Sequence, residues 1–299
     1  MRTRADDWFA VRAAARLLKP FMSNLTRFAA LVAVPVLGLT RSITAAPSAA
    51  DSVAHLKREA WSVVELRRYT TAPHTRPRFA AWFDAYFPEA FEQLGALVFG
   101  QFLDCADPNR FVWLRGYRDL GARPIVNAAF YYGPLWREHR TKVNAILPDS
   151  DNVLLLQPLP GHALALLPAV DPIDEPHGAQ GIVVMHIFAV RKGHESAFAA
   201  KLDPVMARWR ADGARDVGLL ATLDVPDNFP QLPVREDGPW LVWIGLVRDR
   251  AALDALTPAL DAGIGGLAGS GMLCGDTERL VLDPSPRSRL RWLDKETAP

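Results

Sequence analysis

The chain has 299 residues, a length that fits about two domains of ordinary size. Its formal net charge of +1 excludes a basic field for holding nucleic acid, so no nucleic-acid partner is expected. Cys105 and Cys274 lie far apart, and neither has a second cysteine at metal-ligand spacing, which argues against a zinc site and a disulfide framework. We therefore expect two buried free thiols.

Residues 1–58 differ in composition from the rest of the chain. Their first part, "MRTRADDWFAVRAAARLLKPF", is basic, and the segment from Met22 resembles a secretory signal peptide. That segment carries Arg27, an apolar run over 28–39 and the small residues Ser48-Ala49-Ala50. The apolar run is shorter than the roughly 20 residues that span a bilayer, so no transmembrane span is expected. We treat residues 1–58 as a leader outside the fold.

Two interpretations of this leader stay open. A signal peptide predicts a periplasmic or secreted protein. The alternative is a translated leader without a role, because residues 1–21 do not belong in front of a signal peptide and Arg41 follows the apolar run too closely. That alternative predicts a cytoplasmic protein.

Between residues 59 and 160 the sequence predicts a βαββαβ unit. Apolar and polar side chains alternate over 62–70, 96–104 and 110–117, which indicates three strands, and "NVLLLQP" predicts a fourth. Aromatic residues at helical spacing in "RPRFAAWFDAYFPEAFEQL" predict the first helix, and a longer helical stretch covers 120–146. The short turn "CADPN" joins the second and third strands.

The same order of elements recurs after a break. Residues 161–181 contain "PAVDPIDEPHGAQG", whose prolines, aspartates and glycines indicate a solvated linker in preference to a metal site. A second βαββαβ unit covers 182–287, and a tail covers 288–299. Phe79 aligns with Phe198 and Trp113 with Trp243, and the second unit has a longer loop, "PDNFPQLPVREDGP". A repeat of this length indicates a duplicated domain.

The duplication predicts how the chain folds. One βαββαβ unit makes an antiparallel sheet with helices on one face and leaves the other face bare. Two such units can bury their bare faces against each other. We therefore predict an α+β fold in which two tandem ferredoxin-like βαββαβ domains form an intrachain dimeric α+β barrel. Further oligomerisation stays open.

The first strand, "WSVVELRRYT", places charge on one of its faces. Val64 and Leu66 share one face, whereas Glu65, Arg67 and Tyr69 share the other. We expect the polar face to point into the space between the two sheets, where an isolated charge costs several kcal/mol unless it is paired or bound to a ligand. By the same alternation, the other residues expected to line that space are Trp113, Arg115, Tyr117, His186, Phe188 and Trp243.

The segments "VVELRRYTTAP", "PNRFVWLRGYRDL" and "GPLWREHRTKVNAIL" resemble the NIPSNAP family over residues 62–158. The family's E-L-R-x-Y first strand is present as Glu65 to Tyr69. Its third strand, N-x-V-x-H-x-W-x-Y-like, departs here, because Trp113 stands at the His position and Arg115 at the Trp position. Roles tied to that His or Trp are therefore not carried over. The second unit looks like a diverged copy without E-L-R-x-Y.

What the resemblance implies is mainly a fold. The family belongs to the dimeric α+β barrel superfamily, which also includes cofactor-free monooxygenases, isomerases and haem-handling enzymes. It implies no agreed catalytic residues. We expect neither a cofactor nor a metal ion in this chain.

The candidate site residues follow from the polar and aromatic pattern. Those proposed for binding are Glu65, Arg67, Tyr69, Trp113, Arg115, Tyr117, Trp136, Phe188 and Trp243. The alternative is a Glu–Arg pair that only stabilises the sheets, with tryptophans in ordinary packing. His186 and His139 are candidate proton-transfer residues, for which structural histidines are the alternative.

These observations lead to two hypotheses, and they leave open whether the protein is an enzyme. The first is a NIPSNAP-like protein that binds a small amphipathic molecule between its two sheets, with cofactor-independent oxygenase or isomerase chemistry as its enzymatic form. An anionic or hydroxyl end of the molecule would lie near the polar wall of Arg67 and Tyr69, and its apolar body would lie against Phe188 and Trp243. His186 would lie between the two walls. The second is a non-enzymatic interaction or scaffold protein with a filled barrel. A cavity of a few hundred Å³ lined by Glu65, Arg67, Tyr69 and His186 would favour the first hypothesis. A barrel filled by Trp113, Trp243 and Phe188 would favour the second.

Overall fold

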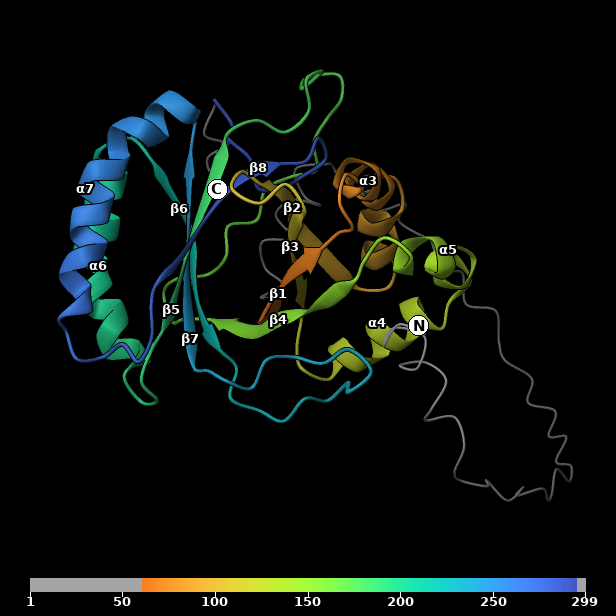
Figure 1. Ribbon diagram of the computed structural model, residues 1–299, viewed down its shortest axis with the longest axis horizontal. Helices are drawn as coiled ribbons and strands as arrows, with labels where there is room; N and C mark the ends of the chain where they lie inside the picture. Colours follow the sequence, from red (N-terminus) through yellow and green to blue (C-terminus); the bar gives the residue numbers. More distant parts are fainter. Residues whose placement is uncertain (1–60, 295–299) are drawn as a thin grey trace, which may run out of the picture. The chain divides into compact units, whose positions relative to one another are not determined.

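The computed structural model describes residues 61–294, which form a closed barrel of eight antiparallel strands with helices outside it (Figure 1). The leader and signal peptide predicted for residues 1–58 lie outside the described residues. Among the described helices, none combines the length and the apolar character needed to cross a membrane.

The elements follow the predicted order closely. The first half comprises β1 (Val63–Thr70), α3 (Arg76–Gln93), β2 (Ala96–Asp104), β3 (Arg110–Tyr117), α4 (Ala122–Tyr131), α5 (Pro134–Asn144) and β4 (Asp149–Pro158). The second half comprises β5 (Ile182–Ala189), α6 (Glu195–Ala211), β6 (Arg215–Thr222), β7 (Trp240–Val247), α7 (Arg250–Ala268) and β8 (Glu278–Pro284).

The helix expected over 120–146 is two helices, α4 and α5. Gly133 between them has an extended backbone, with φ −75° and ψ 168°. Pro134 causes the break, because its ring disfavours a helical conformation in the preceding residue and it has no N–H to donate.

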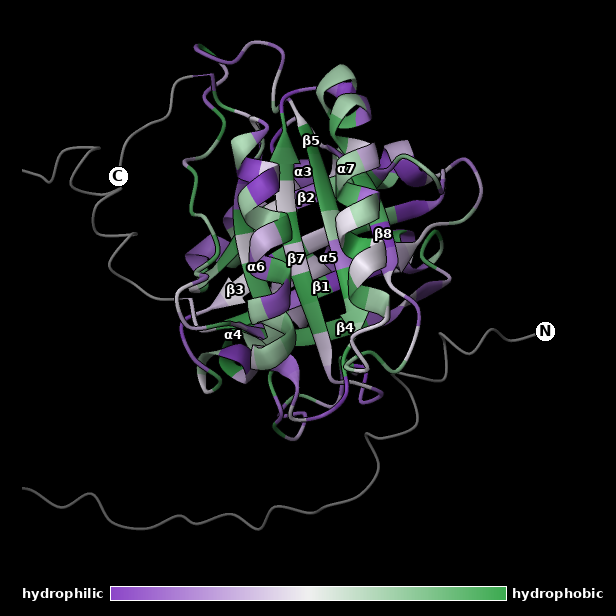
Figure 2. Ribbon diagram, turned by 90° about the vertical axis from the view of Figure 1, so that its left-hand side faces the viewer, coloured by the Kyte–Doolittle hydropathy of each residue, from purple (hydrophilic) through white to green (hydrophobic). Residues whose placement is uncertain are grey.

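The barrel consists of two four-stranded sheets joined at their edges. The strand order is β1-β3-β2-β8-β5-β7-β6-β4, so β4-β1-β3-β2 forms the first sheet and β8-β5-β7-β6 the second. The sheets join where β2 pairs with β8 and β4 with β6. Helices α3, α4 and α5 lie outside the first sheet and α6 and α7 outside the second (Figure 1). Figure 2 shows α6 and α7 lying over β5 and β7.

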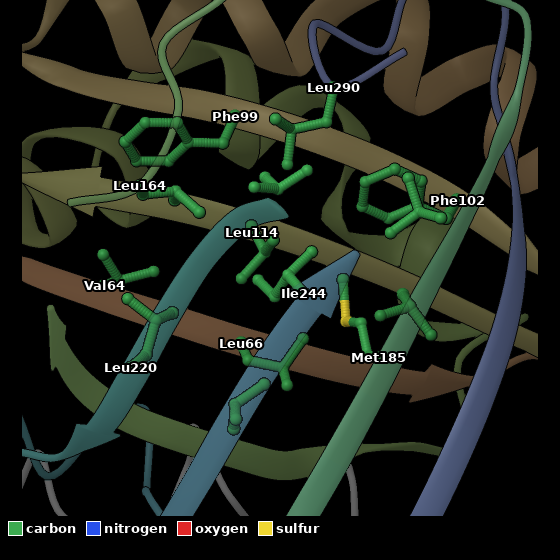
Figure 3. Packing of buried hydrophobic residues seen from close by; sticks show 14 of the residues in the cluster. Val64, Leu66, Phe99, Phe102, Leu114, Leu164, Met185, Leu220, Ile244 and Leu290 are labelled. Atoms are coloured by element: carbon green, nitrogen blue, oxygen red, sulfur yellow. The ribbon is translucent and has the colours of Figure 1, made fainter. Parts of the chain in front are cut away.

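Apolar side chains from both sheets fill the barrel interior. Leu66 on β1 pairs with Leu114 on β3, and Met185 on β5 pairs with Ile244 on β7, and all four are fully buried. These side chains point toward one another between the sheets (Figure 3). At roughly 1.5–3 kcal/mol for each large buried side chain, this interior is a major source of stability.

The predicted linker and tail also contribute to the core. Leu164, in the segment between the two halves, and Leu290, near the end of the described chain, are buried in the interior cluster. Arg291 is almost fully buried and donates to both carboxylate oxygens of Glu175 at 2.5 Å. Most of the predicted linker is exposed or partly exposed, but long-range packing and this ion pair hold parts of it.

The prediction of buried thiols was wrong as well. Cys105 and Cys274 are free, but both are exposed, because each lies in a connecting segment outside the strands and helices. Among residues 61–294 there is no group of three or more His, Cys, Asp or Glu side chains that could hold a metal ion.

Candidate functional site

The polar face of β1 points toward the helices. Glu65, Arg67 and Tyr69 alternate with Val64 and Leu66, and the latter two occupy the barrel interior. Tyr69 packs with Phe79 and Phe83 of α3 in a separate cluster outside the first sheet. The prediction that this face lines the space between the sheets was therefore wrong. Both faces of the strand are buried: the aliphatic face lies in the barrel interior, and the polar face lies under the helices.

The same correction applies to the other residues expected between the sheets. Trp113, Arg115 and Tyr117 lie opposite Arg67, Glu65 and Val63 on the neighbouring strand, and so share the helix-covered face. In the second sheet, Phe188 and Trp243 belong to the cluster beneath α6 and α7.

Glu65 is the centre of a buried network of charged side chains, which we call the Glu65 cluster: Glu65, Arg67, Arg115 and Arg123. Arg67 Nη1 and Arg115 Nε donate to Oε2 of Glu65 at 2.8 and 2.7 Å. Arg123 Nε, from α4, donates to Oε1 at 2.6 Å. All four side chains are buried. A single carboxylate therefore accepts from three arginines in a region without water access.

The arginines differ in how fully their nitrogens are paired. Arg67 Nε donates to the hydroxyl of Tyr69 at 2.9 Å. Arg123 Nη1 donates to Asp227 Oδ1 at 2.7 Å and to Asn228 Oδ1 at 2.9 Å. Arg115 Nη2 lies 2.7 Å from Glu65 Oε2 but is poorly aligned for a hydrogen bond, and Arg115 Nη1 has no acceptor among residues 61–294.

Aromatic rings surround the cluster. The guanidinium carbon of Arg115 lies 4.7 Å from the ring centre of Phe91, 5.1 Å from Trp113, 5.4 Å from Tyr117 and 6.0 Å from Tyr131. Tyr131, at the end of α4, is partly exposed, whereas the other three rings are fully buried. Cation–π contacts of this kind stabilise a desolvated guanidinium.

The charges determine the ionisation of the cluster. Burial alone would raise the pKa of Glu65, but the charges of Arg115, Arg67 and Arg123 outweigh it and hold that pKa well below its usual range. Burial raises the pKa of Tyr69 to about 12, although Arg67 opposes the shift. Near neutral pH, Glu65 is therefore ionised and a weak base, and Tyr69 keeps its proton. The arrangement suits the stabilisation of an anion better than the removal of a proton.

His186 lies in the second sheet, beneath α6 and α7. Its ring stacks on Trp243, with ring centres 5.4 Å apart, and lies 6.1 Å from Phe188. Burial, with a smaller contribution from Arg279, lowers its pKa to about 4. The predicted position of His186 between a polar and an apolar wall was wrong, and an imidazole with this pKa is neutral and weakly basic at pH 7.

The two candidates on α5 lie outside the Glu65 cluster. His139 packs against α3, with its ring 4.8 Å from Tyr86 and 5.2 Å from Trp82. Trp136 is buried beside Phe130 and Tyr131, and its Nε1 has no acceptor among the described residues.

A loop from the second half covers one side of the cluster. The β6–β7 loop (residues 223–239) supplies Asp227 and Asn228, and Asn228 Nδ2 also donates to the carbonyl of Leu120 at 2.7 Å. A cavity of about 400 Å³ lies under this loop, lined by Asp227 and by Leu155, the β4 partner of Glu65. The cavity therefore adjoins the cluster on its Asp227 side.

Sequence reasoning missed Arg123, Asn127, Tyr131 and Asp227. Arg123 and Asn127 lie four residues apart on α4, on the face that also buries Val126 and Phe130. That spacing was a usable signal, because polar residues on the buried face of a helix need partners. Asp227 had no local signal, since only the closed barrel brings its loop to α4.

Comparison with known proteins supports the fold. No family model and no curated protein matches the chain. Among solved structures, it is similar to a candidate monooxygenase from Fusobacterium nucleatum subsp. nucleatum, with a TM-score of 0.50 and 11% identity over 80% of this chain and 99% of that chain. It is also similar to an anthrone oxidase-like protein, with a TM-score of 0.50 and 15% identity over 76% of this chain and 92% of that chain. The chain thus shares the fold of these solved structures, and its closed barrel of eight antiparallel strands is formed by one chain.

Proposed function

We propose that this protein binds a small, partly aromatic molecule in the layer between its first sheet and helices α3, α4 and α5. The layer, not the space between the sheets, holds the polar side chains of β1 and β3 among aromatic rings. Apolar side chains fill most of the space between the sheets, and Arg68, which shares a strand face with Val64 and Leu66, already donates to Glu278 and Asn152. Ligand sites combine an apolar lining with a few placed polar groups, which is the composition of this layer.

Unpaired donors carry this proposal. Trp113 Nε1, Trp136 Nε1 and Asn127 Nδ2 are buried in this layer and find no acceptor among the described residues. An unpaired buried donor costs about 1–3 kcal/mol, so each such group calls for an explanation. A bound molecule with oxygen acceptors would satisfy them. The cavity beside Asp227 gives space next to the layer.

Cofactor-independent oxygenation or isomerisation is the enzymatic form of the proposal. A positively charged cluster would stabilise a substrate that has lost a proton. Solved structures described as a candidate monooxygenase and as anthrone oxidase-like share the fold, and they support the reaction class by that analogy alone. Binding is the primary claim, because the structure places His139 against α3 and His186 under α6 and α7.

We also propose that the chain is a tandem NIPSNAP-like protein. The residues of the E-L-R-x-Y pattern, Glu65, Arg67 and Tyr69, are the ones that build the cluster. The two sheets also match in detail. Arg67 pairs with Trp113 as His186 pairs with Trp243, and each sheet has a register shift at the corresponding place, before Gly100 and before Gly218.

The alternative is a non-enzymatic scaffold protein, and the filled barrel interior favours it. Aliphatic side chains fill most of the interior, whereas Trp113, Trp243 and Phe188 lie in the helix-covered clusters outside the sheets. Under this alternative the Glu65 cluster only stabilises the packing of α4 on the sheet.

Native mass spectrometry of the full-length protein, purified from its own host, tests the proposal. We expect a retained small molecule on the wild type. Trp113→Phe keeps an aromatic ring at this position and removes one unpaired donor. The fraction of protein that retains the molecule should therefore fall. Trp240→Phe is the matched control, because its buried Nε1 is also unpaired but its ring packs against the barrel interior. If neither the wild type nor the control retains a molecule, the scaffold alternative stands.

A further inference from the structure

We propose that the molecule bound in this layer carries an anionic oxygen group, a carboxylate or an ionised enol or phenol, and that Arg115 Nη1 is its main donor. The inference rests on the proposed function and adds the chemical class of the ligand. It follows from the count of charges, from the pairing of each arginine nitrogen and from the rings around Arg115.

The charges of the cluster do not balance. Three arginines, Arg67, Arg115 and Arg123, are buried, and two carboxylates, Glu65 and Asp227, pair with them. One positive charge is therefore in excess. Asp151 is close enough to interact with Arg67, but it is exposed, so water screens its charge. A buried charge without a partner is costly, and an anionic ligand would supply that partner.

Arg115 is the arginine of the cluster with buried nitrogens that make no hydrogen bond within residues 61–294, namely Nη1 and Nη2. Arg67 uses Nη1 for Glu65 and Nε for Tyr69, and Arg123 uses Nε for Glu65 and Nη1 for the β6–β7 loop. Arg115 directs Nε and Nη2 toward one oxygen of Glu65 and leaves Nη1 without an acceptor. A guanidinium edge of this kind is suited to a carboxylate or phenolate oxygen.

The surroundings of Arg115 favour an aromatic or conjugated anion. Phe91, Trp113 and Tyr117 lie around its guanidinium, so a flat ligand body would meet flat side chains. Tyr131, the partly exposed ring of the set, marks the side facing solvent. The cavity under the β6–β7 loop is lined by charges of both signs, among them Glu195, Glu236, Lys192 and Arg235, so selectivity for an anion would come from the arginines of the Glu65 cluster.

Titration with 4-nitrophenol tests the charge of the bound group, because its phenolate absorbs visibly and its phenol does not. We expect the full-length protein to bind the phenolate and to lower the apparent pKa of the dye by about one unit, a tenfold shift. Arg115→Lys keeps a cation beside Glu65 but removes Nη1, and should abolish the shift. Arg208→Lys, at an exposed arginine of α6, is the matched control and should keep it.

Asp227→Asn gives a second, independent readout. It removes a carboxylate that competes with the ligand for positive charge, so binding of benzoate should tighten by about tenfold, while binding of neutral benzamide stays unchanged. Asn228→Ala loosens the same loop without altering charge, and equal tightening in both variants would overturn the charge argument.

The outcomes separate the two proposals. A retained or added molecule that is neutral, or that binds Arg115→Lys as tightly as wild type, overturns the anionic class and leaves the proposed function standing. The absence of any bound molecule, from the native host or among these probes, overturns both.

Discussion

Replacing Glu65 by glutamine tests whether this carboxylate holds the first sheet and α4 together. Glu65→Gln keeps the shape of the side chain and removes its charge. Three arginines donate to the carboxylate at 2.6–2.8 Å, and all four side chains are buried. Removing one partner of a buried ion pair costs about 3–5 kcal/mol. The variant raises the excess positive charge of the cluster from one to two. We therefore expect the free energy of unfolding to fall by about 4 kcal/mol.

Urea unfolding followed by circular dichroism measures that loss. Asp261→Asn is the control, because its ion pair with Arg279 is exposed on both sides and should be worth less than about 1 kcal/mol. The pH dependence of the free energy of unfolding gives a second test. The pKa of Glu65 is lower in the fold than in the unfolded chain, so its stabilisation is present above pH about 4.3 and is lost as the pH falls below that value. A loss below about 1 kcal/mol at neutral pH would refute the central role of Glu65.

Three further predictions concern stability. The pKa of His186 is lowered from 6.5 to about 4 in the fold, so the unfolded chain binds the proton first as the pH falls. Between pH 6.5 and about 4 the free energy of unfolding of the wild type should therefore fall by up to about 3 kcal/mol, and that of His186→Phe should not. An equal pH dependence in both proteins, by urea unfolding, would contradict this. Leu290→Ala should cost about 2–5 kcal/mol, because Leu290 is fully buried in the barrel interior; a melting temperature unchanged from wild type would show that the tail does not close the core. Arg67→Met should cost roughly 1–4 kcal/mol by the same unfolding assay, and a change within 0.5 kcal/mol would place its pair with Glu65 in solvent.

The strands were predictable because their alternation is local. In β1, Val64 and Leu66 share one face and Glu65 and Arg67 the other, as the sequence indicates. Alternation does not say which face the helices cover. In a closed barrel both faces of a strand are buried. The polar residues of β1 lie in the layer where Arg123 of α4 can pair with them, and the aliphatic residues lie in the interior.

Contacts between distant segments were not predictable in the same way. Arg123 pairs with Asp227 across more than a hundred residues, and Arg291 pairs with Glu175 across a similar span. Such pairs depend on how the barrel closes, which no short window of sequence encodes. The longer loop of the second half was visible in the sequence, but its position over the cluster of the first half was not.

A crystal structure with bound 4-bromobenzoate tests the central claim most directly, because the bromine can be located by its anomalous signal. We predict a single bromine position among the rings between the first sheet and helices α3, α4 and α5, with the carboxylate within hydrogen-bond distance of Arg115 Nη1. A bromine position between the two sheets, or under α6 and α7, with Arg115 unchanged, would contradict the account.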